Sequence, residues 1–289
     1  MIAALALRQA TAQLDAAGIS NARHEAEWLL ADALGVERLE LYTGADREMS
    51  ASIADRFLGA IDRRAAGEPL QYVLGWEEFY GLRLEVGPAA LIPRPETELL
   101  VDAAVAQLST VSLTDGPPRF LDVGTGTGAI AIAVACEAAS SKGVAIDCSA
   151  PALALAQCNR ARYMLESRLT LLGGDLCGPL SARNRFHVVM ANLPYVCSGA
   201  ITSLEPGVRD WEPRLALDGG GDGLVLMARL LADAGPLMAP VGRLMLEIGA
   251  GQSHEVARLA ARHGWIVKKI VADLSGIERV VVLSRKAAP

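Results

Sequence analysis

Apolar positions in the first 75 residues recur at the spacing of amphipathic helices. Ile53, Phe57 and Ile61 repeat every four residues, which places them on one helix face. Ser52 and Asp55 fit a capping pattern at the start of this helix. No convergent polar cluster of a catalytic kind accompanies these patterns. We therefore predict that residues 1–75 form a small all-α domain for packing or partner recognition.

The pattern changes after residue 75, where short apolar runs surround a turn residue. Apolar side chains at positions 79, 82, 84 and 86 indicate two short strands, with Gly81 at the turn between them. Residues 76–92 are therefore predicted to form a β-hairpin that connects the helical domain to the rest of the chain.

From residue 93 onward, apolar strand runs alternate with helical segments. Seven runs are typical of strands: RFLDVG, GVAIDCS, LTLLGGDL, FHVVMANLPY, GRLMLEIG, and the two halves of WIVKKIVADLSGIERVVVLSR. Such alternation indicates a parallel sheet covered on both faces. The last two runs are joined by a short loop and predict an antiparallel hairpin at one edge. The predicted class is α/β, with a mostly parallel seven-stranded sheet in a domain spanning residues 93–289.

Composition and charge narrow the classes of function. The 289 residues carry a net charge of −6, whereas proteins that grip long phosphate backbones usually have a basic surplus. We therefore expect no primary nucleic-acid binding. The sequence has no run of 18 apolar residues free of charge or glycine, so no membrane segment is expected. Five scattered cysteines and four unclustered histidines favour a reducing cytoplasm and no metal site.

A glycine-rich turn follows the first strand of the predicted sheet and opens a helix. Its residues are Gly124, Thr125, Gly126, Thr127 and Gly128. Glycine lets the backbone approach a ligand closely, and the start of a helix presents free N–H groups. The run also satisfies G-x-G-x-x-A, so on its own it leaves several nucleotide-type cofactors open, dinucleotides included.

Polar residues follow four of the predicted strands at their carboxyl ends. They are Asp122, Asp147, Asp175 and Asn192. Ligands of open parallel sheets lie beyond these ends, so the four residues predict a site. Asp147 stands 19 residues after Gly128, near the ~20 expected for an acid that binds a ribose hydroxyl; capping the next helix is its alternative role. Asp122 either anchors the glycine turn or meets a cationic cofactor group.

The last of these polar residues opens the run Asn192, Leu193, Pro194 and Tyr195. Asn and Pro commonly start a loop after a strand, so the run alone is compatible with an ordinary turn. Its position on the same edge as the three acids favours a site instead.

These motifs resemble those of class I S-adenosylmethionine-dependent methyltransferases. More narrowly, the chain resembles the protein-(glutamine-N5) methyltransferases that modify peptide chain release factors. The resemblance spans nearly the full length and includes LIPRPETELLV, LDVGTGTGAIAIA, NLPY, WEPRLALDGGGDGL and DLSGIERVVV. It implies a Rossmann-like class I methyltransferase fold, S-adenosylmethionine as cofactor, a release factor as protein substrate, and a cytoplasmic location.

The resemblance also implies where the cofactor binds. The glycine turn would pass under its methionine part, Asp147 would bind the ribose, and Asp175 and Leu176 would flank the adenine. The segment IPRPETE either borders this pocket or only starts a helix, with Pro95 in its first turn. DGGGDGL is predicted to be a tight turn, since no Lys or Ser/Thr stands at the spacing of a phosphate loop.

The run from Asn192 to Tyr195 would hold the substrate amide. The Asn192 side-chain oxygen and the Leu193 carbonyl would accept from the NH₂ group, Pro194 would stiffen the loop, and Tyr195 would pack on the amide plane. The family pattern is Asn-Pro-Pro-Tyr, and Leu193 replaces its first Pro. The related rRNA adenine methyltransferases also use Asn-Leu-Pro-Tyr.

Three other functions remain open at this level. An adenine N6-methyltransferase acting on RNA or DNA could grip an exocyclic amine of a flipped base with the same motif. The acidic balance and the small helical domain argue against it. A cofactor-binding adaptor without catalysis would not need an intact NLPY run beside an intact glycine turn. A dinucleotide oxidoreductase leaves NLPY unexplained.

Overall fold

The chain folds into two compact units in the structure, a computed structural model that describes residues 1–42, 48–182 and 185–286. The first unit comprises Met1–Trp76 and Glu205–Trp211; the second comprises Glu77–Leu204 and Glu212–Pro289. The short helix α8 (Pro206–Arg209) thus belongs to the first unit, although the chain reaches it from the second.

The first unit is helical. Its elements are α1 (Ala3–Ala16), α2 (Ala22–Leu34), the 3₁₀ helix η1 (Arg38–Tyr42), α3 (Ala51–Ala65) and α4 (Leu70–Leu74). Leu14, Phe57 and Ile61 are fully buried between these helices. The side chain of Ser50 accepts a hydrogen bond from the Ile53 N–H and caps α3. The capping role predicted for Ser52 is therefore wrong, because that residue already lies inside the helix.

The predicted hairpin is present as β1 (Trp76–Phe79) and β2 (Leu82–Glu85). Its turn residues Tyr80 and Gly81 both have positive φ, 53° and 69°, as tight two-residue hairpins require. The Tyr80 N–H donates to Glu98, and the Tyr80 hydroxyl donates to Asp102, each at 2.7 Å. These bonds fix the turn against α5 (Glu98–Ser109).

The second unit is built on one seven-stranded sheet, as predicted. The strands are β3 (Arg119–Val123), β4 (Lys142–Asp147), β5 (Leu169–Gly173), β6 (Phe186–Ala191), β7 (Met238–Glu247), β8 (Trp265–Ala272) and β9 (Glu278–Arg285). Their order is β5-β4-β3-β6-β7-β9-β8, and β9 is antiparallel to both of its neighbours. β8 forms the edge, and β9 pairs between it and β7.

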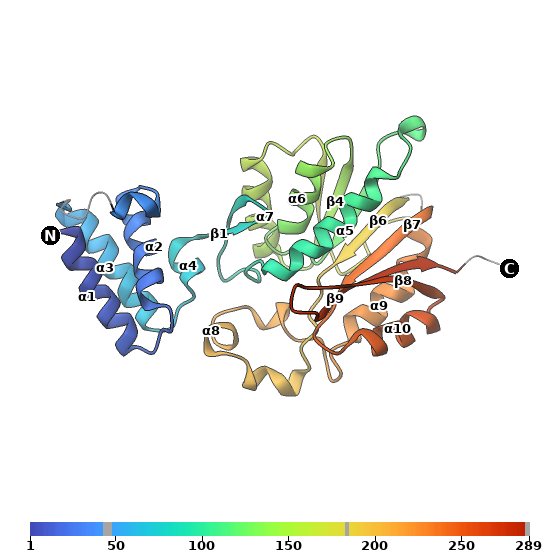
Figure 1. The fold of residues 1–289 in the computed structure, drawn as a ribbon. Helices are drawn as coiled ribbons and strands as arrows, with labels where there is room; N and C mark the ends of the chain where they lie inside the picture. The colour runs from blue at the N-terminus through green and yellow to red at the C-terminus, as the bar shows by residue number, and fades with distance from the viewer. Residues whose placement is uncertain (43–47, 183–184, 287–289) are drawn as a thin grey trace. The chain divides into compact units, whose positions relative to one another are not determined.

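Helices cover both faces of the sheet (Figure 1). On one face lie α5, α6 (Ala129–Glu137) and α7 (Ala150–Arg162); on the other lie α9 (Val225–Asp233) and α10 (Ser253–Arg262). Residues 129–135 of α6 are all buried, which explains why this helix is apolar on every side. In the described part of the chain, we find no helix that combines the length and the apolar character needed to cross a membrane.

The strand order reverses beside β3. β4 and β5 follow on one side of it, whereas β6 and β7 lie on the other. The loops that leave β3 and β6 therefore diverge to opposite faces, and a crevice opens beyond the carboxyl ends of these strands.

Candidate active site

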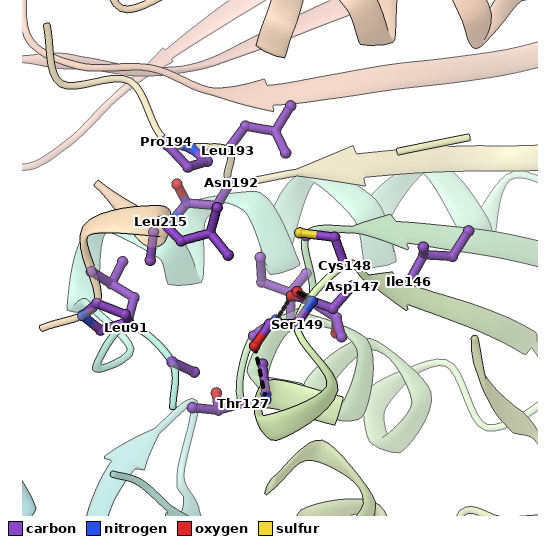
Figure 2. A pocket seen from close by; sticks show the side chains of 18 of the residues that line it. Leu91, Thr127, Ile146, Asp147, Cys148, Ser149, Asn192, Leu193, Pro194 and Leu215 are labelled. Carbon is purple, nitrogen blue, oxygen red and sulfur yellow. Dashed lines mark hydrogen bonds between the residues drawn. The ribbon is translucent and has the colours of Figure 1, made fainter. Parts of the chain in front are cut away.

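A cavity of about 520 Å³ lies beyond the carboxyl ends of β3, β4 and β6. In Figure 2, Asn192 and Pro194 lie on one side of it, and Asp147 and Ser149 lie on the other. The predicted site residues that line it are Gly124, Thr125, Gly126, Thr127, Asp147, Asp175, Leu176, Asn192, Leu193 and Pro194. Two predicted site residues, Gly128 and Tyr195, are not among the described residues that line the cavity.

The glycine turn adopts a backbone that other residues tolerate poorly. Gly124, Gly126 and Gly128 have φ of 76°, 55° and 84°. A Cβ on Gly124 would stand 3.1 Å from Cδ2 of Leu193, so the turn also packs directly on the loop after β6. Gly128 is the N-cap of α6. A Cβ there would come within 2.9 Å of Ile132, and the glycine therefore serves the packing of the helix rather than the cavity wall.

Asp147 ties the glycine turn to the end of β4. One carboxylate oxygen accepts from the Gly126 N–H at 2.8 Å. The other accepts from the Ser149 N–H at 2.8 Å, and Asp147 and Ser149 are both labelled in Figure 2. The N-cap of α7 is Ser149, whose side chain accepts from the Ala152 N–H, so Asp147 does not fill its alternative capping role. A carboxylate has about four acceptor positions, which leaves two for a ligand in the cavity.

Asp122 anchors the glycine turn from beneath. Its side chain is fully buried and accepts a 2.6 Å hydrogen bond from the Thr125 hydroxyl. Burial raises the pKa of Asp122 to about 7; the nearby Asp147 acts in the same direction, and the Thr125 hydroxyl opposes both. Of its two predicted roles, the structure favours the anchor, because Asp122 is not among the residues described around the cavity.

Asp175 and Leu176, which follow β5, also line the cavity. The Asp175 carboxylate forms a 2.5 Å ion pair with Arg229 of α9, and both side chains are exposed. Leu176 has φ of 47° and is only 8% exposed, a backbone conformation that is uncommon for a branched residue. Arg229 also lines the cavity, and sequence reasoning missed it because α9 gives no local signal of a site.

Asn192 follows β6 and points its amide nitrogen at Thr97, whose Oγ1 accepts from Nδ2 at 3.1 Å. Leu193 is buried in the core, and Pro194 lines the cavity. Tyr195 is partly buried against the core, and its backbone carbonyl accepts from Nε2 of Gln252 at 3.1 Å. Burial raises the pKa of the Tyr195 hydroxyl to about 12, with the Glu247 carboxyl adding to the effect.

The segments IPRPETE and WEPRLALDGGGDGL meet at the cavity. Glu212 is 5% exposed; it forms an ion pair with Arg94 and accepts a 3.1 Å hydrogen bond from the Ile92 N–H. Pro93 and Arg94 line the cavity, together with Leu215 from the second segment. The reading of IPRPETE as a bare helix start is therefore incomplete.

The DGGGDGL segment forms a glycine turn, as predicted, and that turn packs on the loop after β6. Val196 and Asp218 form a short parallel bridge, and the Gly219 N–H donates to the Val196 carbonyl at 2.8 Å. A Cβ on Gly219 would stand 2.6 Å from the Pro194 carbonyl oxygen. Only glycine lets the two loops approach this closely. Within the described residues, no cluster of His, Cys, Asp or Glu could hold a metal ion.

Two families match parts of the sequence: the PrmC N-terminal domain over residues 6–75 and a methyltransferase domain over residues 120–204. The release factor glutamine methyltransferase of Moorella thermoacetica is 40% identical over 282 residues, which cover 97% of this chain and 98% of the relative. That of Cereibacter sphaeroides is 38% identical over 289 residues and covers both chains completely. The chain belongs to the release factor glutamine methyltransferase family.

Another release factor glutamine methyltransferase, from Nitratidesulfovibrio vulgaris, is 37% identical and covers 96% of this chain and 94% of its own. Among solved structures, the hMettl16 catalytic domain in complex with the MAT2A 3'UTR hairpin 6 has a TM-score of 0.56 at 14% identity. That match covers 80% of this chain and 81% of the other. At this identity the likeness concerns the fold alone. It confirms the class I methyltransferase fold expected of a release factor glutamine methyltransferase.

Proposed function

We propose that this protein transfers a methyl group from S-adenosylmethionine to the side-chain amide nitrogen of a glutamine in a peptide chain release factor. Its membership of the release factor glutamine methyltransferase family supports the substrate class. One observation of the structure carries the proposal further. The glycine turn with Asp147, and the acceptor pair Asn192 and Leu193, line a single cavity.

The cofactor-binding residues present in the cavity fit S-adenosylmethionine. The turn from Gly124 to Thr127 offers a close backbone approach, and Asp147 retains acceptor positions for ribose hydroxyls. Asp175 and Leu176 are proposed to flank the adenine. When bound, the cofactor supplies an electrophilic methyl group on a positively charged sulfur.

The two acceptors, Asn192 and Leu193, are proposed to explain how a poorly nucleophilic amide nitrogen can react. An amide nitrogen reacts slowly because its lone pair is delocalised into the carbonyl. The Asn192 side-chain oxygen and the Leu193 carbonyl are proposed to accept from the substrate NH₂ group and fix its direction. Positioning of this kind contributes up to ~7–11 kcal/mol in favourable cases. The amide proton can leave to water after transfer, so no strong base is required.

Two roles remain around the acceptor pair. Pro194 is proposed to stiffen the loop. We propose that Tyr195 packs on the planar amide of the substrate and excludes water, while the hydrogen bond from Gln252 to its carbonyl supports the loop backbone.

The helical unit is proposed to recognise the body of the release factor. It matches the PrmC N-terminal domain, and its described residues include no group of His, Cys, Asp or Glu that could hold a metal ion. The net charge of −6 favours a protein partner over a long phosphate backbone. We also propose a cytoplasmic location, since translation factors act there and the five described cysteines are free thiols.

Mass spectrometry of purified release factor, after incubation with the enzyme and S-adenosylmethionine, tests the proposal. We expect the mass of one methyl group on a single glutamine-containing peptide. Methylated adenine in a parallel RNA or DNA sample, with unmodified release factor, would favour the adenine N6-methyltransferase instead.

A further inference from the structure

Asn192 and Glu247 occupy equivalent positions at the ends of neighbouring strands. The parallel register of β6 and β7 pairs Ala191 with Leu246, so the next residue of each strand lies side by side. Thr97, from the 3₁₀ helix η2 (Pro95–Thr97), lies beside both and accepts from Nδ2 of Asn192 at 3.1 Å. The side chains of Thr97 and Asn192 both lower the pKa of the Glu247 carboxyl, as hydrogen-bond donors beside it do.

The chemistry of these groups fixes the direction of the hydrogen bonds. A threonine hydroxyl has a single proton, and the Thr97 oxygen already accepts from the Asn192 amide. The hydroxyl proton can then be donated to the ionised Glu247 carboxylate, the form that Thr97 and Arg279 both favour. With its nitrogen turned toward these two residues, the Asn192 amide leaves Oδ1 as the acceptor for a ligand.

Both supporting residues are almost completely buried, at 3% exposure each. Oε2 of Glu247 has no hydrogen-bond partner among the described residues. Such a group costs about 1–3 kcal/mol of folding free energy. The charged groups that act on Glu247 are Arg279 of β9, which favours its ionised form, and Glu96 of η2, which opposes it. Arg279 itself is held by a 2.8 Å ion pair with Asp273.

We propose that Glu247 and Thr97 are positioning residues that hold the Asn192 amide so that Oδ1 faces the substrate amide. This inference rests on the proposed function. It explains why IPRPETE belongs to the active site: its threonine sets the orientation of a side chain on another element. It also gives a function to a buried acid that no packing requirement explains.

The matched variants Thr97→Val and Thr97→Ser separate positioning from packing. Valine has the shape of threonine but no hydroxyl, and serine keeps the hydroxyl while it loses the methyl group. We expect Thr97→Val to lower kcat about 10- to 100-fold, as expected when a reacting group is misplaced, with the KM for S-adenosylmethionine within about twofold. Thr97→Ser should recover most of kcat. Equal losses in both variants, or an unchanged kcat in Thr97→Val, would overturn the proposal.

A second measurement does not depend on the substrate. In wild-type protein labelled with ¹⁵N, the side-chain NH₂ signals of Asn192 should exchange slowly with solvent, because Nδ2 donates to the buried Thr97 and Glu247 is buried beside it. Thr97→Val and Glu247→Gln should each accelerate that exchange. Fast exchange in the wild type would contradict the inference, whereas a wild type that protects this amide but does not methylate release factor would contradict only the proposed function.

Discussion

Arg94 and Glu212 form an ion pair although 118 residues separate them in the sequence. The Glu212 side chain is almost fully buried, and its second oxygen accepts from the Ile92 backbone. One carboxylate thus ties together two segments that border the cavity. Removal of this carboxylate leaves the Arg94 guanidinium and the buried Ile92 N–H without their partner.

Glu212→Ala should lower the free energy of unfolding by about 1–3 kcal/mol, the cost of leaving buried polar groups unsatisfied. Urea denaturation followed by circular dichroism measures this change. Arg162→Ala is the control, because it removes an ion pair with Glu85 in which both side chains are exposed, and it should cost at most about 1 kcal/mol. Equal losses of unfolding free energy in the two variants would show that Glu212 does not stabilise the contact between the two segments.

Asp147→Ala should weaken the binding of S-adenosylmethionine, measured by titration calorimetry. Hydrogen bonds to a charged acceptor contribute about 1.5–3 kcal/mol, and the variant also releases the Gly126 N–H. Ser149→Ala is the control, since it removes the cap of α7 while leaving the Asp147 carboxylate in place. Unchanged affinity in Asp147→Ala would locate the cofactor elsewhere.

Asn192→Ala should reduce kcat more than it changes any KM, because the lost oxygen is proposed to orient the nucleophile. Leu193→Pro should keep most of kcat, since only the carbonyl at this position is proposed to act. The proline variant should still lose about 1–2 kcal/mol of stability, because Leu193 is 3% exposed and packs in the core. An inactive Leu193→Pro beside an active Asn192→Ala would contradict the two-acceptor arrangement.

Stability should depend on pH through Asp122. Burial raises its folded pKa to about 7 from an ordinary 3.8, so between these values the folded protein keeps a proton that the unfolded chain has released. The free energy of unfolding must therefore fall as pH rises through this window. Asp122→Asn removes the titration, and its stability relative to wild type should increase from pH 4 to pH 7. A constant difference would mean that Asp122 is ionised throughout.

Removal of residues 1–75 should reduce methylation of intact release factor more than it reduces binding of S-adenosylmethionine. The reason is that the helical unit is proposed to hold the partner, whereas every residue around the cavity belongs to the second unit. Methylation rate and calorimetric affinity are the two measurements. A proportional loss of both would indicate a structural role for the helical unit.

Much of the fold could be predicted because its signals are local. Apolar runs and turn residues identified all seven strands, and the polar residues after them identified the edge that carries the cavity. The position of β9 between β7 and β8 was not predictable. The sequence pattern of a hairpin does not show which of its two strands lies at the edge of the sheet.

The candidate site was predictable only where its residues are contiguous in the sequence and form a motif with a known local backbone conformation. The glycine turn and NLPY are such motifs. Glu247 ends an ordinary apolar strand, and its relation to Thr97 depends on the register of two strands and on a separate helix. Tyr195 is a further case: its position in the motif predicts contact with the substrate, and the hydrogen bond from Gln252 to its backbone carbonyl was not predictable from the sequence.

The interior position of β9 has a consequence for how the protein is made (Figure 1). β8 leaves the ribosome before β9, and in the finished sheet it pairs only with β9 among the described strands. Until the last strand emerges, β7 therefore has an open edge and β8 has no partner, a state that favours aggregation. The same strand pairs Val280 with Glu247, so the order of synthesis makes the proposed support of Asn192 one of the last parts of the active site to assemble.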